Sequence, residues 1–177
     1  MRISHPPVMP DSLLEFRQIE LADIAAWYGY LSIPNVLEHT SWKLESAEEL
    51  KPALASYHSL DPASPIRLVV AGKEDGSFIG TAGFHTISVA HRTAEIAYDF
   101  APGHWGKGYA TACCNAMLEW GFAERRYVRI QALALDTNLA SIRVLEKCGF
   151  SLEGKLRNYR IVRGVPRDFW LYAKTAG

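Results

Sequence analysis

The sequence predicts a single α/β domain in which helices flank one mixed β-sheet. Hydrophobic residues recur with the period of a strand or of a helix, in the order strand, helices, three strands, helix, strand, helix and two strands. The chain has 177 residues, 49% of them hydrophobic, which suits one domain with a sizeable core. We therefore expect residues 1–177 to form one domain, with the proline-studded residues 1–12 as a flexible arm.

Local signals mark where the elements begin and end. Ser46 with Glu49 three residues later predicts a capped helix, which Pro52 is expected to bend or shorten. Residues 74–77 (Glu-Asp-Gly-Ser) predict a tight hairpin turn, and Gly149 is expected to stop the last helix. The expected elements are a strand over 13–19, helices over 20–31 and 46–57, two strands within 66–87, a strand over 94–102, a helix from 108, a strand over 128–135, a helix over 138–147, and strands through 150–162 and 166–174.

Composition excludes several classes of function. Lys+Arg and Asp+Glu are both 19, so only the basic stretch 157–168 favours nucleic-acid binding, and the zero net charge argues against it. The three cysteines, Cys113, Cys114 and Cys148, form no CxxC pair, which argues against a disulfide framework and against a metal site. The start lacks a secretory apolar segment, and no apolar run has the length of a membrane helix. We expect a cytoplasmic protein with no membrane or nucleic-acid partner.

A glycine-rich stretch, GHWGKGYAT at 103–111, lies between a strand and an amphipathic helix. Free amides at a helix N-terminus and the helix dipole favour an anion there, and glycines at 106 and 108 permit close approach and positive φ. Lys107 and Thr111 could add a charge and a hydroxyl group. The spacing fits neither the nucleoside-triphosphate P-loop nor G-x-G-x-x-G. By itself the stretch leaves two alternatives open, a phosphate site and a structural turn.

A second motif lies downstream and changes the reading of the first. The residues concerned are Gly106-Lys107-Gly108-Tyr109-Ala110-Thr111, then Asn138, Ser141 and Glu146-Lys147-Cys148-Gly149-Phe150, then Glu153-Gly154, Leu156-Arg157, Gly164 and Asp168. Their order and spacing resemble the GNAT acetyl-CoA-dependent N-acetyltransferases, and the last group resembles the RimJ/RimL branch, named for ribosomal-protein N-terminal acetylation. The resemblance extends from about Leu14 to Lys174. It implies a mostly antiparallel sheet with a central splayed strand pair and helices on both faces.

The resemblance also implies where acetyl-CoA, the co-substrate, binds. The strand residues Tyr98, Asp99 and Phe100 would pair with the pantetheine arm, and Asn138 would hydrogen-bond to it. Trp105 stands where the family pattern has a polar residue, but backbone amides would do most of the binding. The loop that would hold the pyrophosphate is Trp105, Gly106, Lys107, Gly108, Tyr109, Ala110 and Thr111.

The catalytic residues are less well marked. Many family members carry a tyrosine that protonates the departing thiolate, where this chain has Leu145. Ser141, one turn earlier on the same helix face, is our candidate for that role, with a solvated helix serine as the alternative. Glu95 is the first candidate for the base that takes the amine proton, before Asp99 and His85, although each could be structural.

The resemblance implies an N-acetyltransferase acting on a primary amine, either a protein N-terminus or a small molecule. The aromatic residues Trp27, Tyr28, Tyr30 and Trp42 fall in the region that lines the acceptor pocket in this fold. The alternative is a non-catalytic acyl-CoA-binding module of the same fold. The sequence leaves both a monomer and a homodimer open.

Overall fold

The computed structural model describes residues 3, 5–9, 13–38 and 44–177. Its strands form one seven-stranded sheet in the order β1-β2-β3-β4-β5-β7-β6. Every neighbouring pair is antiparallel except β4 and β5, which are parallel. The strands are β1 (Leu14–Gln18), β2 (Ile66–Gly72), β3 (Phe78–Ser88), β4 (Thr93–Phe100), β5 (Arg129–Leu135), β6 (Ser151–Val162) and β7 (Val165–Thr175).

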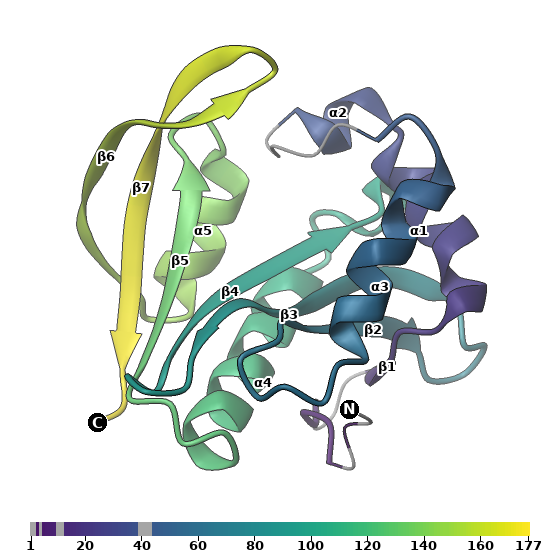
Figure 1. The fold of residues 1–177 in the computed structure, drawn as a ribbon, viewed down its shortest axis with the longest axis horizontal. Helices are drawn as coiled ribbons and strands as arrows, with labels where there is room; N and C mark the ends of the chain where they lie inside the picture. Colours follow the sequence, from purple (N-terminus) through teal and green to yellow (C-terminus); the bar gives the residue numbers. More distant parts are fainter. Residues whose placement is uncertain (1–2, 4, 10–12, 39–43) are drawn as a thin grey trace.

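Helices cover both faces of the sheet (Figure 1). On one face, Trp27 and Leu50 pack with Val69 of β2 in a core cluster. On the other face, Met117 of α4 packs with Leu68 of β2 in the larger cluster. The helices are η1 (Leu21–Asp23), α1 (Ile24–Leu31), α2 (Pro34–Leu37), η2 (Ala47–Leu50), α3 (Lys51–Tyr57), η3 (Pro102–His104), α4 (Tyr109–Ala123) and α5 (Leu139–Lys147). This arrangement confirms the predicted fold class.

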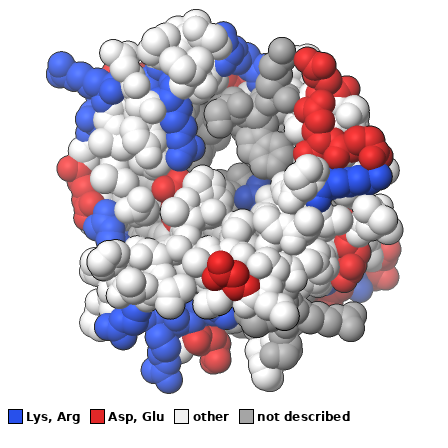
Figure 2. Space-filling view, viewed as in Figure 1, with Lys and Arg blue, Asp and Glu red and all other residues white. Residues whose placement is uncertain are grey.

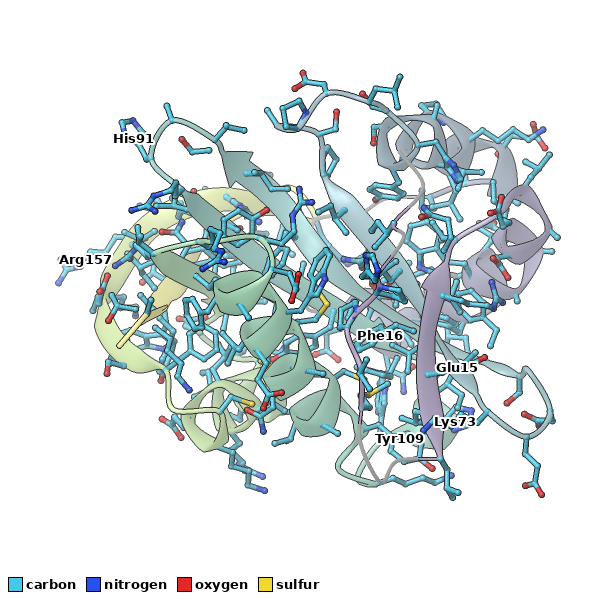
Figure 3. The ribbon with its side chains drawn as sticks, turned by 90° about the horizontal axis from the view of Figure 1, so that it is seen from below. Glu15, Phe16, Lys73, His91, Tyr109 and Arg157 are labelled. Carbon is cyan, nitrogen blue, oxygen red and sulfur yellow. The ribbon has the colours of Figure 1, made fainter. Side chains whose placement is uncertain are left out.

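The two core clusters lie on opposite faces of the sheet, because side chains along each strand alternate between the two faces. Neighbouring side chains of a strand point to opposite faces, as Glu15 and Phe16 of β1 do in Figure 3, where Phe16 is buried and Glu15 exposed. In β2 both faces are covered, so every residue from Ile66 to Gly72 is buried. Such a strand has a continuous apolar run in place of alternation.

The prediction for residues 46–57 was partly wrong. The Ser46 side chain forms no capping hydrogen bond, and the Glu49 carboxylate instead accepts from the amide of Glu45 at 3.3 Å. The segment divides into η2 and α3, and Pro52 lies in the first turn of α3, where a missing amide costs nothing. The α-helix is thus shorter than expected, beginning at Lys51, and Pro52 lies in its first turn without bending it. The short helix α2 was not predicted.

The N-terminal arm has no helix or strand at its described positions, but two contacts join it to α4. The Trp120 Nε1 atom donates to the carbonyl of His5 at 2.8 Å. Met9 is buried, with its sulfur 3.6 Å from the Cys113 thiol. No helix among the described residues is long and apolar enough to cross a membrane.

Candidate acetyl-transfer site

The central parallel strands β4 and β5 pair over only three positions. The pairs are Thr93 with Arg129, Ala94 with Ile130, and Glu95 with Gln131. β5 pairs with β7 along its whole length on its other edge, and beyond the three β4 pairs a cavity of about 470 Å³ opens between β4 and β5. Figure 2 shows the molecule hollowed on this face, between the β5–β7 half and the helices α1–α3. The splayed pair implied by the family resemblance is therefore present.

Side chains of successive β4 residues point to opposite faces of the strand, so they line two different sides of the cavity. Asp99 contacts Trp27 and Tyr30 of α1, whereas the Tyr98 hydroxyl lies 3.0 Å from Ser141 Oγ of α5. Glu95 lies four residues before Asp99 in β4, and because this spacing is even, both side chains lie on the same face of the strand. The strand thus presents both carboxylates on one face and a phenol toward α5 on the other.

The carboxylate of Asp99 is occupied by donors from three elements. It forms an ion pair with Arg67 and accepts a hydrogen bond from the Tyr30 hydroxyl. The Trp27 Nε1 atom donates at 3.2 Å and the Thr81 hydroxyl at 3.0 Å. Burial lowers the pKa of the Arg67 guanidinium, while Tyr57 and Tyr30 oppose that effect. A carboxylate held by an arginine and three neutral donors is a poor proton acceptor, which argues against Asp99 as the base.

Glu95 is buried but lies at a polar junction. Its Oε1 atom is 3.3 Å from an Arg160 nitrogen of β6 and 3.5 Å from His85 Nε2. The amide of Gln131 donates to its Oε2 atom at 3.3 Å. Glu95 is 7% exposed and lines the cavity, so it combines access to the cavity with partners that hold it in place.

A β-bulge places His85 beside Glu95. The pairing of β3 with β4 passes from Phe84–Ile96 to Thr86–Glu95, which leaves His85 as the extra residue. Bulges re-aim side chains in this way beside functional sites. The pKa of His85 is lowered by burial, against the opposing effect of Glu95, so the ring is neutral at neutral pH. The bulge lies in β3, next to the splayed strand.

The glycine-rich loop lies between the end of β4 and the start of α4. Gly106 and Gly108 have φ of 74° and 79°, with nothing within 4 Å of the position of an added Cβ atom. Gly108 is the N-cap of α4, and the first amides of a helix have no partner within it. The loop therefore has the left-handed backbone, open space and free amides that a pyrophosphate requires.

The side chains of this loop differ in their contacts and exposure. The Trp105 indole donates to the carbonyl of Phe100 at 2.7 Å, which ties the loop to β4 where the family pattern has a polar residue. The Tyr109 ring stacks on His104, with centroids 6.2 Å apart. Lys107 is exposed, whereas Ala110 and Thr111 are half-buried in the first turn of α4.

The N-cap of α5 and two residues within the helix, Ser141 and Leu145, line the cavity from its other side. Asn138 is the N-cap, with Oδ1 accepting from the Ser141 amide at 3.0 Å, which leaves its NH₂ group as the donor for a ligand. Leu145 is 1% exposed and packs in the core. Ser141 is thus the hydroxyl that α5 brings to the cavity lining.

Sequence reasoning missed Arg67 and Arg160, both of which line the cavity. Arg67 could have been identified from the sequence, because a charged residue inside the apolar run Ile66–Gly72 requires a buried partner. The sequence does not distinguish Arg160 in this way, since basic residues are common in the exposed strand around it. Of the aromatic residues expected to line the acceptor pocket, Trp27 lines the cavity, and Trp42 lies outside the described residues.

The β6–β7 hairpin extends toward α2, as Figure 1 shows at the top of the molecule. An Arg163 nitrogen donates to the carbonyl of Leu37 at 2.7 Å. The turn itself holds Arg163 and Gly164 at φ of 52° and 78°, as in a tight hairpin. This contact joins the two halves of the molecule.

Comparisons with known proteins agree with this geometry. The family described as "Acetyltransferase (GNAT) domain" matches residues 14–151. The chain is 32% identical over 171 residues to the uncharacterized N-acetyltransferase YoaA of Bacillus subtilis strain 168, covering 94% of this chain and 96% of that protein.

Two solved structures are also similar. Spermidine N-acetyltransferase from Vibrio cholerae, solved with CoA and spermine, superposes with a TM-score of 0.83 and 25% identity, over 93% of this chain and 96% of that one. Ribosomal-protein-S5-alanine acetyltransferase from Vibrio fischeri has a TM-score of 0.81 and 22% identity, over 93% of both chains. The latter similarity supports the fold alone.

Proposed function

Because this chain belongs to the GNAT family of acetyl-CoA-dependent N-acetyltransferases, we propose that it acetylates a primary amine that carries little further positive charge. A protein N-terminus or a small monoamine fits this description. The observation that carries the proposal is the cavity between β4 and β5, which has Glu95 in its lining, while the glycine-rich loop follows the far end of β4 outside that lining.

The donor half of the site would be built from backbone. Amides of Gly106, Gly108 and the first turn of α4 would hold the pyrophosphate, and the edge of β4 beyond Glu95 would pair with the pantetheine arm. The same edge can present amides to the oxyanion that forms when an amine attacks the thioester. Asn138 would donate to the arm from α5.

The acceptor half contains the residues for proton removal. We assign Glu95 as the base, acting directly or through one water molecule, with Arg160 and Gln131 holding its carboxylate. An unperturbed α-amine has a pKa near 8, so a large fraction is already neutral, and a modest base suffices.

Charge balance favours a weakly charged acceptor over a polyamine. Among the described residues that line the cavity, Asp99 is paired with Arg67, and Glu95 with Arg160. A polyamine carries several positive charges and requires carboxylates that are not already neutralised. The RimJ/RimL-like residues 153–168 of the sequence agree with a protein N-terminus.

Thiol release from acetyl-CoA tests the proposal. The assay compares a peptide with a free α-amine, the same peptide with its amine blocked, and spermidine. We expect turnover with the free amine, none with the blocked peptide, and a lower kcat/KM with spermidine. A preference for spermidine would overturn the acceptor assignment, and absence of both turnover and acetyl-CoA binding would overturn the whole proposal.

A further inference from the structure

Tyr98 and Ser141 connect β4 to α5 across the donor side of the cavity. The two hydroxyl oxygens are 3.0 Å apart, and both residues line the cavity. Tyr98 Oη also lies 3.5 Å from the carbonyl of Ser141, a longer and weaker contact. A hydrogen bond between the hydroxyl groups therefore dominates this pair.

The chemistry of the two groups sets the direction of this hydrogen bond. The distance alone allows either hydroxyl to donate; because a phenol is a stronger acid than an aliphatic alcohol, we infer that Tyr98 donates and Ser141 Oγ accepts. Burial raises the pKa of the Tyr98 phenol, so it remains protonated and able to donate over the whole working range of pH.

The remaining contacts of Ser141 leave its own hydrogen atom available. A serine inside a helix commonly donates to the carbonyl one turn earlier. Among the described residues, the Ser141 hydroxyl has Tyr98 as its hydrogen-bond partner. Its amide is held by Asn138 Oδ1 at 3.0 Å, so backbone and oxygen are both fixed while the hydroxyl hydrogen can turn toward the cavity.

We propose that Tyr98 is a positioning residue that orients the hydroxyl group of Ser141 toward the sulfur of departing coenzyme A. The proposal rests on the proposed function. As the tetrahedral adduct collapses, the C–S bond breaks and its electron pair stays on sulfur. The Ser141 O–H group donates a hydrogen bond to that thiolate, while the proton of the new ammonium leaves on the Glu95 side. Leu145, at the position of the family tyrosine, has no hydrogen to donate.

The thiol of bound coenzyme A gives a direct test that needs no acceptor. Its thiolate is titrated by ultraviolet difference absorbance in the wild type, Tyr98→Phe, Ser141→Ala and the double variant. We expect the wild type to lower the thiol pKa relative to free coenzyme A, and each single variant to reverse most of that shift. The double variant should add nothing to Ser141→Ala, because Tyr98 acts through Ser141.

Steady-state kinetics give a second measurement. Tyr98→Phe should lower kcat about 10-fold, the effect of one lost hydrogen bond, with little change in the KM of acetyl-CoA. Ser141→Thr retains a hydroxyl and should recover part of the activity that Ser141→Ala loses. Tyr127→Phe, a matched variant outside the cavity lining, should leave kcat and thiol pKa unchanged.

Two outcomes would overturn the inference. In one, Tyr98→Phe leaves the thiol pKa at its wild-type value while Ser141→Ala raises it. In the other, Tyr98→Phe lowers kcat equally in the wild type and in Ser141→Ala, which would give Tyr98 an independent role. Failure of the wild type to bind coenzyme A is a different result, because it contradicts the proposed function itself.

Discussion

Glu95 and Gln131 form the last pair between β4 and β5, and their side chains hydrogen-bond at 3.3 Å where the two strands separate. The candidate base thus stands at the closed end of the cavity. The sheet hydrogen bonds behind it are intact, whereas the strand edge ahead of it is free for a ligand. This position makes the role of Glu95 directly testable.

Glu95→Gln should lower kcat about 100-fold, the usual contribution of a general base, and leave the KM of acetyl-CoA nearly unchanged. The amide retains the shape of the side chain but has lost its basicity. Glu124→Gln, at the exposed C-terminal end of α4 and outside the cavity lining, is the matched control and should keep full activity. Comparable kcat values for Glu95→Gln and wild type would remove Glu95 from the mechanism.

Asp99→Ala should destabilise the fold by about 3–5 kcal/mol, because it leaves the buried Arg67 guanidinium without its counter-charge. Urea unfolding measures this effect. Glu153→Ala removes an exposed ion pair and should cost about 1 kcal/mol or less. Similar losses for the two variants would contradict a structural role for Asp99.

Gly108→Ala should raise the KM of acetyl-CoA about 10-fold by disturbing the amides that would face the pyrophosphate. It also forces a side chain into a left-handed conformation, at a cost of about 1–2 kcal/mol. Gly76→Ala controls for that strain, since Gly76 lies in the β2–β3 turn with φ of 67° and equally open space. If both variants raise the KM alike, strain and not phosphate contact is the cause.

His85 should make stability fall at acid pH. Burial lowers its folded-state pKa, so the folded protein binds this proton less readily than the unfolded chain. The contribution is complete above the unfolded pKa of about 6.5 and is lost as pH falls through and below that value. The side chain is 44% exposed, so the slope should be shallow.

The measurement is the unfolding free energy from pH 8 to pH 5, compared between wild type and His85→Gln. The variant should lose less stability than the wild type on acidification. His91→Gln replaces an exposed histidine and should retain the wild-type slope. Parallel curves for His85→Gln and wild type would contradict the prediction.

Much of the fold was predictable because its signals are local. Alternation, helical spacing and turn residues placed most strands and the helices α4 and α5 within a few residues of their observed bounds. Residues 46–57 were harder, because Ser46 and Glu49 fit a capping pattern that tertiary contacts did not use. The helix α2 has one turn only and is too short to show a period.

The sequence by itself determined the residues that we propose for the donor side. The glycines of the loop, Asn138 and Ser141 lie on two short contiguous stretches, and backbone conformation there depends mainly on the residues themselves. The tertiary structure decided the proposed acceptor side, where residues from β2, β3, β4 and β6 meet. A bulge turns His85 toward Glu95, Arg160 arrives from a distant hairpin, and Arg67 neutralises Asp99. Such pairings depend on how strands are ordered and splayed in space, and no local pattern along the chain encodes that order.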